Sequence, residues 1–336
     1  MRRGAIVRIT LIGVVVAILT SLVAILIPWL PDPASKQMDR IEFAYWFATV
    51  ICIGIFAVVM GVLLYSIFAF RVAPDDDSDG PSIHGNTNLE IAWTVVPAVL
   101  VIAIGVLSAV VLSQNGNAGT NPMTIKVIAQ QFAWRFEYPA SKGLKSNELV
   151  MPVDRNITFE FESLDVIHSF WIPQMGQKQD IVPGIDTHIV VTPTREGTFT
   201  LVCTELCGLG HATMRAPVRV VSQQAYDAWV KKQQSGGGAG GADAGKTVFA
   251  SAGCSACHAF TPAGSTAEVG PNLDNVAAAA KKAGEDPAAY VKESIVDPNK
   301  VVASGYQPDV MPGNFGDSLS AQEIDALVTY LTAGSQ

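Results

Sequence analysis

The sequence contains little charge for its length. Only 15% of its 336 residues are Asp, Glu, Lys or Arg, and its mean hydropathy is +0.31. Basic residues are in the minority, with 22 Lys and Arg against 30 Asp and Glu, and no basic domain is present. This balance argues against nucleic acid as a partner. The apolar content excludes a simple soluble enzyme and a disordered chain.

Cysteine and histidine are also scarce, with five of each. Five cysteines in a chain of this length exclude a disulfide-stapled mini-protein. At roughly 100–200 residues per domain, the length allows two or three domains. Residues 113–234 carry 11 basic and 11 acidic side chains, whereas residues 246–336 carry 5 and 10. This difference in charge suggests separate modules.

Three long runs without a charged residue lie before residue 113. They are Ile9–Ile27, Phe43–Phe70 and Ile91–Leu112, of 19, 28 and 22 residues. A helix needs about 20 apolar residues to cross the hydrocarbon core of a bilayer. We therefore expect the second and third runs to form a transmembrane helix hairpin within residues 41–112.

The first run, in residues 1–30, has two interpretations. It follows three arginines, which suits a signal peptide as well as a retained transmembrane helix. In both cases the basic N-terminus is expected in the cytoplasm, which places residues 113–336 on the outer face of a bacterial cytoplasmic membrane. Glu90, at the start of the third run, is either a solvated carboxylate or the entrance of a proton pathway.

From residue 123 onward, apolar residues alternate with polar or small ones. The alternating residues are Ile125 and Val127, then Phe132, Trp134, Phe136 and Tyr138, then Ile157, Phe159 and Phe161, then Phe199, Leu201 and Cys203. Short strands separated by Gly, Pro and Asn turns are typical of a β-sandwich or barrel. We predict such a domain over residues 113–234, ending in a short helix through Trp229.

One loop of this domain gathers side chains that bind soft metals. Cys203, Cys207, His211 and Met214 lie within twelve residues, among glycines that allow a tight turn. Thiolate, imidazole and thioether ligands together suit copper or zinc. A disulfide between the two cysteines is the alternative in an oxidising compartment, but it leaves both His211 and the upstream His168 unexplained. The pattern favours a metal site.

These residues match the pattern of a known family. Cys-x-Glu-x-Cys-x-x-x-His-x-x-Met, with His168 upstream in Val-Ile-His-Ser-Phe, resembles subunit II of haem–copper cytochrome c oxidases. The resemblance extends from about Ile41 to Trp229 and includes Leu-Glu-Ile-Ala-Trp-Thr-Val-Val-Pro in the third run. It implies a cupredoxin fold that holds the dinuclear copper centre CuA.

The resemblance also implies individual roles. The implied copper ligands are Cys203 and Cys207 as bridges, His168 and His211 as caps, Met214 as a weak ligand and the backbone carbonyl of Glu205. The Glu205 side chain would reach a magnesium site at the interface with subunit I. Glu90 matches the carboxylate near the entrance of the K proton pathway.

One position departs from the family pattern. The aromatic segment of the family typically begins Gln-Trp and accepts electrons from soluble cytochrome c through that Trp, but here Gln131 precedes Phe132. Trp134 lies two residues further along the chain. The usual docking route therefore does not carry over unchanged, and Phe132 and Trp134 are our electron-transfer candidates.

A glycine-rich segment precedes the last domain. Residues 235–245 read Ser-Gly-Gly-Gly-Ala-Gly-Gly-Ala-Asp-Ala-Gly, which predicts a flexible linker. Residues 246–336 contain Cys254, Cys257 and His258 in the Cys-x-x-Cys-His pattern that attaches a c-type haem. A zinc site would need a second cysteine pair, which this part of the sequence lacks.

The other axial ligand of the haem follows by elimination. Residues 246–336 contain one histidine, already assigned, and one methionine, Met311. Methionine ligation raises the potential of a haem and suits an electron carrier. The Pro-Asp-Val-Met-Pro context resembles the distal loop of small bacterial cytochromes c, which implies an all-α domain with Met311 as the axial ligand.

Together these features predict subunit II of a terminal oxidase fused to a cytochrome c domain, the caa3 type. Electrons would pass from an outer-face donor, cytochrome c or a quinol–cytochrome c oxidoreductase, to the haem c, then to CuA and subunit I. Oxygen would be reduced to water in subunit I, with proton pumping. Subunit III and membrane lipid are the further predicted partners.

Two alternatives remain open from the sequence. A nitric oxide reductase of the same superfamily could use the same copper subunit, and a general membrane-anchored electron carrier could use the same two cofactors. Co-purification of a fixed multi-span subunit would distinguish an oxidase or a nitric oxide reductase from the general electron carrier. We expect no oxygen-reducing site in this chain, because four of its five histidines are already assigned.

Overall fold

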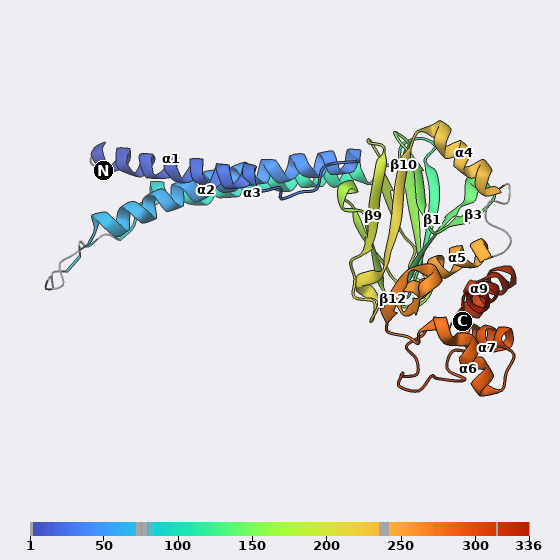
Figure 1. Cartoon of the computed structure of the whole chain (residues 1–336). Coiled ribbons are helices and arrows are strands. Elements are labelled where there is room, and N and C mark those ends of the chain that lie inside the picture. The colour runs from blue at the N-terminus through green and yellow to red at the C-terminus, as the bar shows by residue number, and fades with distance from the viewer. Residues whose placement is uncertain are drawn as a thin grey trace. The chain divides into compact units, whose positions relative to one another are not determined.

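The computed structural model describes residues 3–71, 75, 79–80, 82, 84–234, 242–313 and 315–335. The chain divides into two compact units (Figure 1). The first comprises Met1–Pro33 and Gln37–Asn117, and the second comprises Ala34–Lys36 and Ala118–Gln336. Each unit is described by itself below.

The first unit consists of long apolar helices. They are α1 (Arg3–Leu26), α2 (Lys36–Ala69) and α3 (Thr87–Asn115), and all three are long and apolar enough to cross a membrane. Helix α3 contains its whole charge-free run, and α1 and α2 contain theirs except for the last residue, Ile27 and Phe70. All three predicted apolar runs are therefore helical.

Small residues bring α1 against α2. A methyl group on Gly61 would lie 2.9 Å from the carbonyl oxygen of Ile9, and one on Gly13 would lie 3.2 Å from the carbonyl oxygen of Ala57. Glycine and alanine at such positions allow two helix backbones to approach closely, which is a common way of packing helices in membranes.

Glu90 lies in the first turn of α3, where it has a structural partner. The Asn86 side chain accepts a hydrogen bond from the Leu89 amide, and Glu90 Oε1 accepts one from the Asn86 amide at 3.1 Å. These reciprocal bonds satisfy amides that have no partner within the helix. The side chain of Glu90 is nevertheless exposed.

The second unit begins with two five-stranded sheets. In spatial order the first sheet contains β3 (Leu144–Ser146), β2 (Ala133–Tyr138), β1 (Met123–Gln130), β5 (Ile157–Ser163) and β8 (Thr187–Val191). The second contains β4 (Leu149–Pro152), β10 (Arg215–Val221), β9 (Gly197–Cys203), β6 (His168–Trp171) and β7 (Lys178–Ile181). One apolar cluster joins the two sheets, so they form a β-sandwich.

The alternation seen in the sequence explains this core. Ile125 and Val127 of β1 are fully buried, as is Phe159 of the parallel neighbour β5, while residues between them face outward. Side chains at every second position of a strand share one face. After β10, helix α4 (Gln223–Gln234) buries Trp229 against Tyr138, with ring centroids 5.1 Å apart.

The cytochrome-like region at the end of the chain is mostly helical. Its helices are α5 (Ala242–Ser251), α6 (Val276–Ala283), α7 (Pro287–Val296), α8 (Phe315–Ser318) and α9 (Ala321–Gly334). The region also contains one short strand pair, β11 (His258–Phe260) with β12 (Ser265–Glu268), and has its own apolar core.

The predicted linker at residues 235–245 is only partly visible. Residues 235–241 lie outside the described residues, and the last four residues of the predicted segment belong to the start of α5. The predicted fold class, apolar helices followed by a β-sandwich and a helical cytochrome region, is confirmed.

Candidate metal and haem sites

The first candidate site lies where β9 ends. Cys203 is the last residue of β9, and the loop from there to β10 carries Cys207, His211 and Met214. His168 is the first residue of β6, which pairs with β9 through Phe170 opposite Cys203. Strand pairing thus brings a histidine from 35 residues upstream to the cysteine loop.

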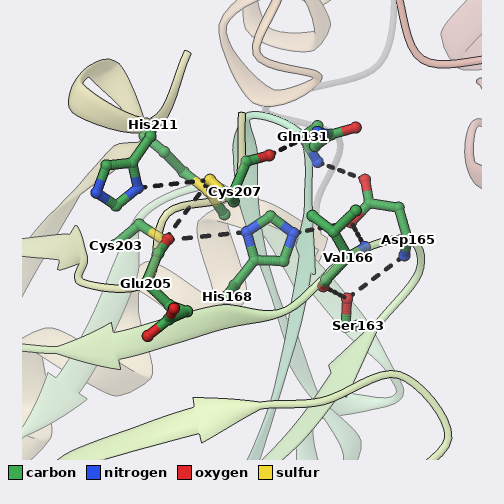
Figure 2. A network of polar contacts seen from close by, with 10 residues as sticks. Gln131, Ser163, Asp165, Val166, His168, Cys203, Glu205, Cys207 and His211 are labelled. Atoms are coloured by element: carbon green, nitrogen blue, oxygen red, sulfur yellow. Dashed lines mark hydrogen bonds and ion pairs between the residues drawn. The ribbon is translucent and has the colours of Figure 1, made fainter. Parts of the chain in front are cut away.

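The two cysteine sulfurs form the centre of this site (Figure 2). Cys203 Sγ and Cys207 Sγ lie 3.9 Å apart, too far for a disulfide bond of about 2.05 Å, and both cysteines are free. Cys203 Sγ lies 3.9 Å from His168 Nδ1, and Cys207 Sγ lies 3.6 Å from His211 Nδ1. The structure therefore places one imidazole beside each sulfur.

Two weaker donors complete the set. Met214 Sδ lies 3.8 Å from Cys207 Sγ, and the carbonyl oxygen of Glu205 lies 3.3 Å from Cys203 Sγ. Met214 is fully buried, whereas the side chain of Glu205 is exposed and points away from the sulfurs in Figure 2. All six residues that the sequence indicated for the metal are thus brought together.

The site has the chemistry of a soft-metal centre. His168, Cys203 and Cys207 are buried, and their ligand atoms lie within 4.8 Å of one another. Two sulfurs with two imidazoles and a thioether suit copper, and a pair of shared thiolates can serve two ions. The donor set present therefore fits a pair of copper ions.

The thiols interact strongly before any metal binds. The hydrogen bond with Cys207, followed by that with His168, lowers the pKa of Cys203. The same bond between the thiols raises the pKa of Cys207, because the charge settles on Cys203. The hydrogen bond between the thiols therefore favours one thiolate over two, so binding of metal to both sulfurs releases a proton.

Asp165 fixes the orientation of His168, a role that the sequence analysis missed. Its Oδ1 lies 2.8 Å from His168 Nε2 and accepts a hydrogen bond from the Val166 amide at 2.7 Å. Its Oδ2 accepts one from the Gln131 amide, also at 2.7 Å. With Nε2 bonded to the carboxylate, Nδ1 of His168 keeps its lone pair toward the sulfur.

The pKa of Asp165 is consistent with its role as a hydrogen-bond acceptor for His168. Although burial opposes the shift, the hydrogen bonds from His168, Gln131 and Val166 lower the pKa of Asp165. Asp165 therefore stays ionised and acts as an acceptor at neutral pH. In the sequence Asp165 lies three residues before His168, but this spacing is common by chance and did not single out Asp165.

Asp165→Asn is expected to lower the copper affinity of the full chain by about 10- to 100-fold, because ligand-orienting partners typically contribute that much. The measurement is a copper competition titration with a chelator. Asp180→Asn is the matched control, since Asp180 also bonds a β6 side chain, Ser169 Oγ at 2.7 Å, but no ligand. Equal affinities of the two variants would show that Asp165 does not orient His168.

Trp134 is an internal part of the site. Only 2% of its surface is exposed, its Nε1 donates a hydrogen bond to the Met214 carbonyl at 3.3 Å, and its ring lies edge-on to His168. A buried indole cannot contact a separate protein directly, and its contacts here are with Met214 and His168.

The second candidate site is in the cytochrome-like region. Cys254, Cys257, His258 and Met311 all line one cavity, although Met311 is 53 residues beyond His258 in the sequence. His258 Nδ1 lies 2.8 Å from the Pro271 carbonyl oxygen, which leaves Nε2 free to bind a metal. Burial lowers the pKa of His258, so its ring stays neutral.

The lining of this cavity suits a flat apolar group held by sulfur and nitrogen. Apart from these four residues it is mainly apolar, with contributions from Phe249, Leu273 and Val291. Gly270 lies against the histidine, where a methyl group would be 2.6 Å from Cε1. Attachment cysteines, an imidazole and a thioether around an apolar cavity fit a haem c.

Comparisons with known proteins agree with both sites. Three family profiles match: cytochrome c oxidase subunit II, transmembrane domain, at residues 26–111; its periplasmic domain at residues 144–221; and cytochrome c at residues 242–335. Cytochrome c oxidase subunit 2 of Alkalihalophilus pseudofirmus is 31% identical over 312 residues, covering 89% of each chain. This chain belongs to the cytochrome c oxidase subunit 2 family.

Other relatives carry the same name. Cytochrome c oxidase subunit 2 of Bacillus subtilis is 30% identical over 325 residues and covers 89% of each chain. The crystal structure of the periplasmic domain of subunit II (CoxB) of Bradyrhizobium japonicum has 29% identity and a TM-score of 0.34. It covers 35% of this chain and 98% of that chain.

The prediction of an oxidase subunit II with a cytochrome c domain is confirmed. As a member of this family, the chain is the membrane-anchored subunit of a haem–copper oxidase, works beside subunit I and carries copper and haem c. The β-sandwich carries the sulfur-rich donor set, and the cytochrome region carries most of the cavity that contains Cys254, Cys257, His258 and Met311.

Proposed function

We propose that this chain carries electrons from its own haem c to its copper pair and from there to subunit I. The observation that supports this most directly is that one compact unit contains both a buried sulfur-rich ligand set and a Cys-x-x-Cys-His haem pocket. Subunit I would then reduce oxygen to water and pump protons.

The proposed copper ligands take distinct roles. Cys203 and Cys207 would hold both copper ions, and His168 and His211 would each bind one of them. The Met214 sulfur and the Glu205 carbonyl are the weak ligands. Bound copper would supply a one-electron redox centre. Because both thiolates would be shared by the two ions, the geometry of the site would change little on oxidation or reduction. The buried sandwich keeps the ligands nearly fixed.

The proposed haem attachment uses the second site. Cys254 and Cys257 would attach the haem through two thioether bonds, and His258 and Met311 would bind its iron. Bound haem supplies the second one-electron centre. The bond from His258 to Pro271 orients the imidazole, and methionine ligation raises the potential of the haem.

The proposed domain division follows these sites. Residues 1–30 and 41–112 lie in the membrane, residues 113–234 form the cupredoxin domain, residues 235–245 the linker, and residues 246–336 the cytochrome c domain. We place them in the cytoplasmic membrane of a bacterium, with both cofactors on its outer face. The glycine contacts between α1 and α2 support retention of the first helix rather than its removal.

Two carboxylates are proposed to act at the boundary with subunit I. The Glu205 side chain is exposed while its carbonyl faces Cys203, so it is free to bind magnesium held jointly with subunit I. Glu90 is exposed at the start of α3 and is proposed as the entrance of a proton pathway. Its hydrogen bond to Asn86 would hold it there.

The electron donor is proposed to meet the cytochrome c domain. Residues 246–336 carry five more acidic than basic side chains, whereas residues 113–234 are balanced. An acidic surface attracts a partner with a basic face and raises the association rate. The donor would be a cytochrome c or a quinol–cytochrome c oxidoreductase, and subunit III would complete the complex.

The proposed function is tested on the complex purified through a tag on this chain. We expect a stoichiometric multi-span subunit to co-purify, and reduced donor to drive oxygen uptake. Nitric oxide consumption without oxygen uptake would instead assign the chain to a nitric oxide reductase. If no such subunit co-purified, the chain would be a general membrane-anchored electron carrier instead. The mass of the intact chain in the same preparation shows whether α1 is retained.

A further inference from the structure

Met311 lies in a long irregular loop between α7 and α8. Most of residues 301–308 in this loop are exposed to solvent. Among residues 301–308, all of which the structure describes, one backbone hydrogen bond forms, from the Tyr306 amide to the Ala303 carbonyl at 3.1 Å. Bonds within the loop therefore do little to hold it in one shape.

Two side chains close this loop at its base. Asn299 Nδ2 donates a hydrogen bond to Asp309 Oδ1 at 2.8 Å, and the Asp309 amide donates one to Asn299 Oδ1 at 2.9 Å. We call this pair the Asn299–Asp309 clasp. Nine residues lie between its members, so the clasp joins the ends of a loop that has few other bonds of its own.

The Asn299 side of the clasp is anchored to the core of the cytochrome region. Helix α7, which ends three residues before Asn299, buries Ile295 in that core, with 5% exposed. Beyond the helix, the Asp297 amide bonds the Glu293 carbonyl at 2.8 Å, and the Lys300 amide bonds the Asp297 carbonyl at 3.1 Å. Asn299 therefore lies in a turn that is fixed to the end of α7.

The Asp309 side of the clasp leads directly to the haem cavity. Asp309 has a φ of +60°, a left-handed conformation that Asp and Asn adopt more readily than other residues with a side chain. Two positions further on, Met311 lines the cavity that also contains His258, and Asn299 lines the same cavity. A single residue separates the clasp from the proposed axial ligand.

We propose that the Asn299–Asp309 clasp holds Met311 in place as the axial ligand of haem c, which makes Asn299 and Asp309 positioning residues. This inference rests on the proposed function and deepens it by naming what fixes the second axial ligand. Met311 is only partly buried against the apolar core. With the clasp broken, the loop gains freedom, and an added ligand competes more successfully with the methionine sulfur for the haem.

Asn299→Ala tests the clasp, because removal of this one side chain removes both hydrogen bonds. Lys300→Ala is the matched control. Lys300 is the next residue and also loses a side-chain bond, from its Nζ to Glu293 Oε2, but that bond joins the turn to α7 and does not reach the far end of the loop. A difference between the two variants therefore reports closure of the loop rather than a general weakening of the turn.

Two measurements on the purified complex follow the ligation by Met311. The first is the weak red absorption band that a methionine ligand gives to an oxidised haem c. The second is the affinity of the oxidised haem c for added imidazole. In Asn299→Ala we expect a weaker band and an imidazole affinity about fivefold higher, the effect of losing two solvent-accessible hydrogen bonds. Lys300→Ala should match the unmodified complex, and equal results for the two variants would overturn the clasp.

Asp309→Asn separates hydrogen bonding from charge. Asparagine retains a side-chain oxygen that accepts from Asn299, leaves the backbone amide in place and tolerates a positive φ, but it removes the negative charge. We therefore expect the band and the imidazole affinity of Asp309→Asn to equal those of the unmodified complex. A change as large as that in Asn299→Ala would contradict the hydrogen-bonded clasp, because the charge would then be the cause.

Asn299→Asp remains informative if Asn299→Ala fails to fold. It keeps the size of the side chain but places a second carboxylate against Asp309, and the repulsion should open the loop. An unchanged band in this variant would also overturn the clasp. The unmodified complex separates the two levels of inference: without a methionine band there, the proposed ligation by Met311 fails, whereas a band that no variant alters refutes the clasp alone.

Discussion

Cys207→Ser is expected to abolish the paired-copper centre. Three soft donors surround its sulfur: Cys203 Sγ at 3.9 Å, His211 Nδ1 at 3.6 Å and Met214 Sδ at 3.8 Å. A serine hydroxyl is a hard ligand that stays protonated at neutral pH, so it cannot bridge two copper ions. Oxygen uptake by the complex should fall to background.

The measurement combines copper content with the electron paramagnetic resonance spectrum of the purified complex. Cys52→Ser is the control, because Cys52 is an exposed free cysteine in α2 and is not among the clustered donors. It should retain both copper ions and full oxygen uptake. Two coppers with an unchanged spectrum in Cys207→Ser would refute a bridging role for this thiol.

Met311→Leu is expected to lower the potential of the haem c by tenths of a volt. Axial ligands set haem potentials over a range of about 0.8 V, and methionine stabilises the reduced iron. Cys254 and Cys257 are unchanged, so the haem should stay attached. Electron delivery from the natural donor should slow sharply, because a haem of lower potential is harder to reduce.

A redox titration followed by haem absorbance measures this shift. Met151→Leu is a suitable control, since Met151 is a fully buried methionine in the core of the β-sandwich and lines neither site. It should leave the haem potential unchanged. An unaltered potential in Met311→Leu would show that another residue provides the axial ligand.

The two sites differ in how their ligands are assembled. Four of the copper-site side chains come from one loop, and only His168 arrives from another strand. The haem pocket takes three residues from one turn and adds Met311 from a distant loop. In both sites, one residue from a distant part of the chain, His168 or Met311, completes the set of ligands that a local motif begins.

Local chemistry was readable from the sequence alone. The apolar runs predicted α1, α2 and α3, because crossing a bilayer depends on length and composition. Alternation predicted the sandwich, and Cys-x-x-Cys-His predicted haem attachment, because these signals are carried by residues close together in the chain. The family resemblance then linked His168 to the cysteine loop before any distance was known.

Other features were decided only by the tertiary structure. The partnership of Asp165 with His168 and Gln131 depends on where the loop before β6 meets the turn between β1 and β2. The alternation in the sequence placed Trp134 on the same strand face as Phe136, but its contacts with Met214 and His168 depend on how the loops and strands pack. No periodic or contiguous signal marked Asp165.

The same distinction applies to Phe132. The sequence by itself determined which cofactors this chain can hold, because soft ligands and haem cysteines are specified by residue type and short spacing. Only the tertiary structure decided that Gly253 lies against the backbone of Phe132 and Gly210 against its ring. Such contacts arise between residues tens of positions apart, and their distances are set by strand pairing and packing rather than by neighbours along the chain.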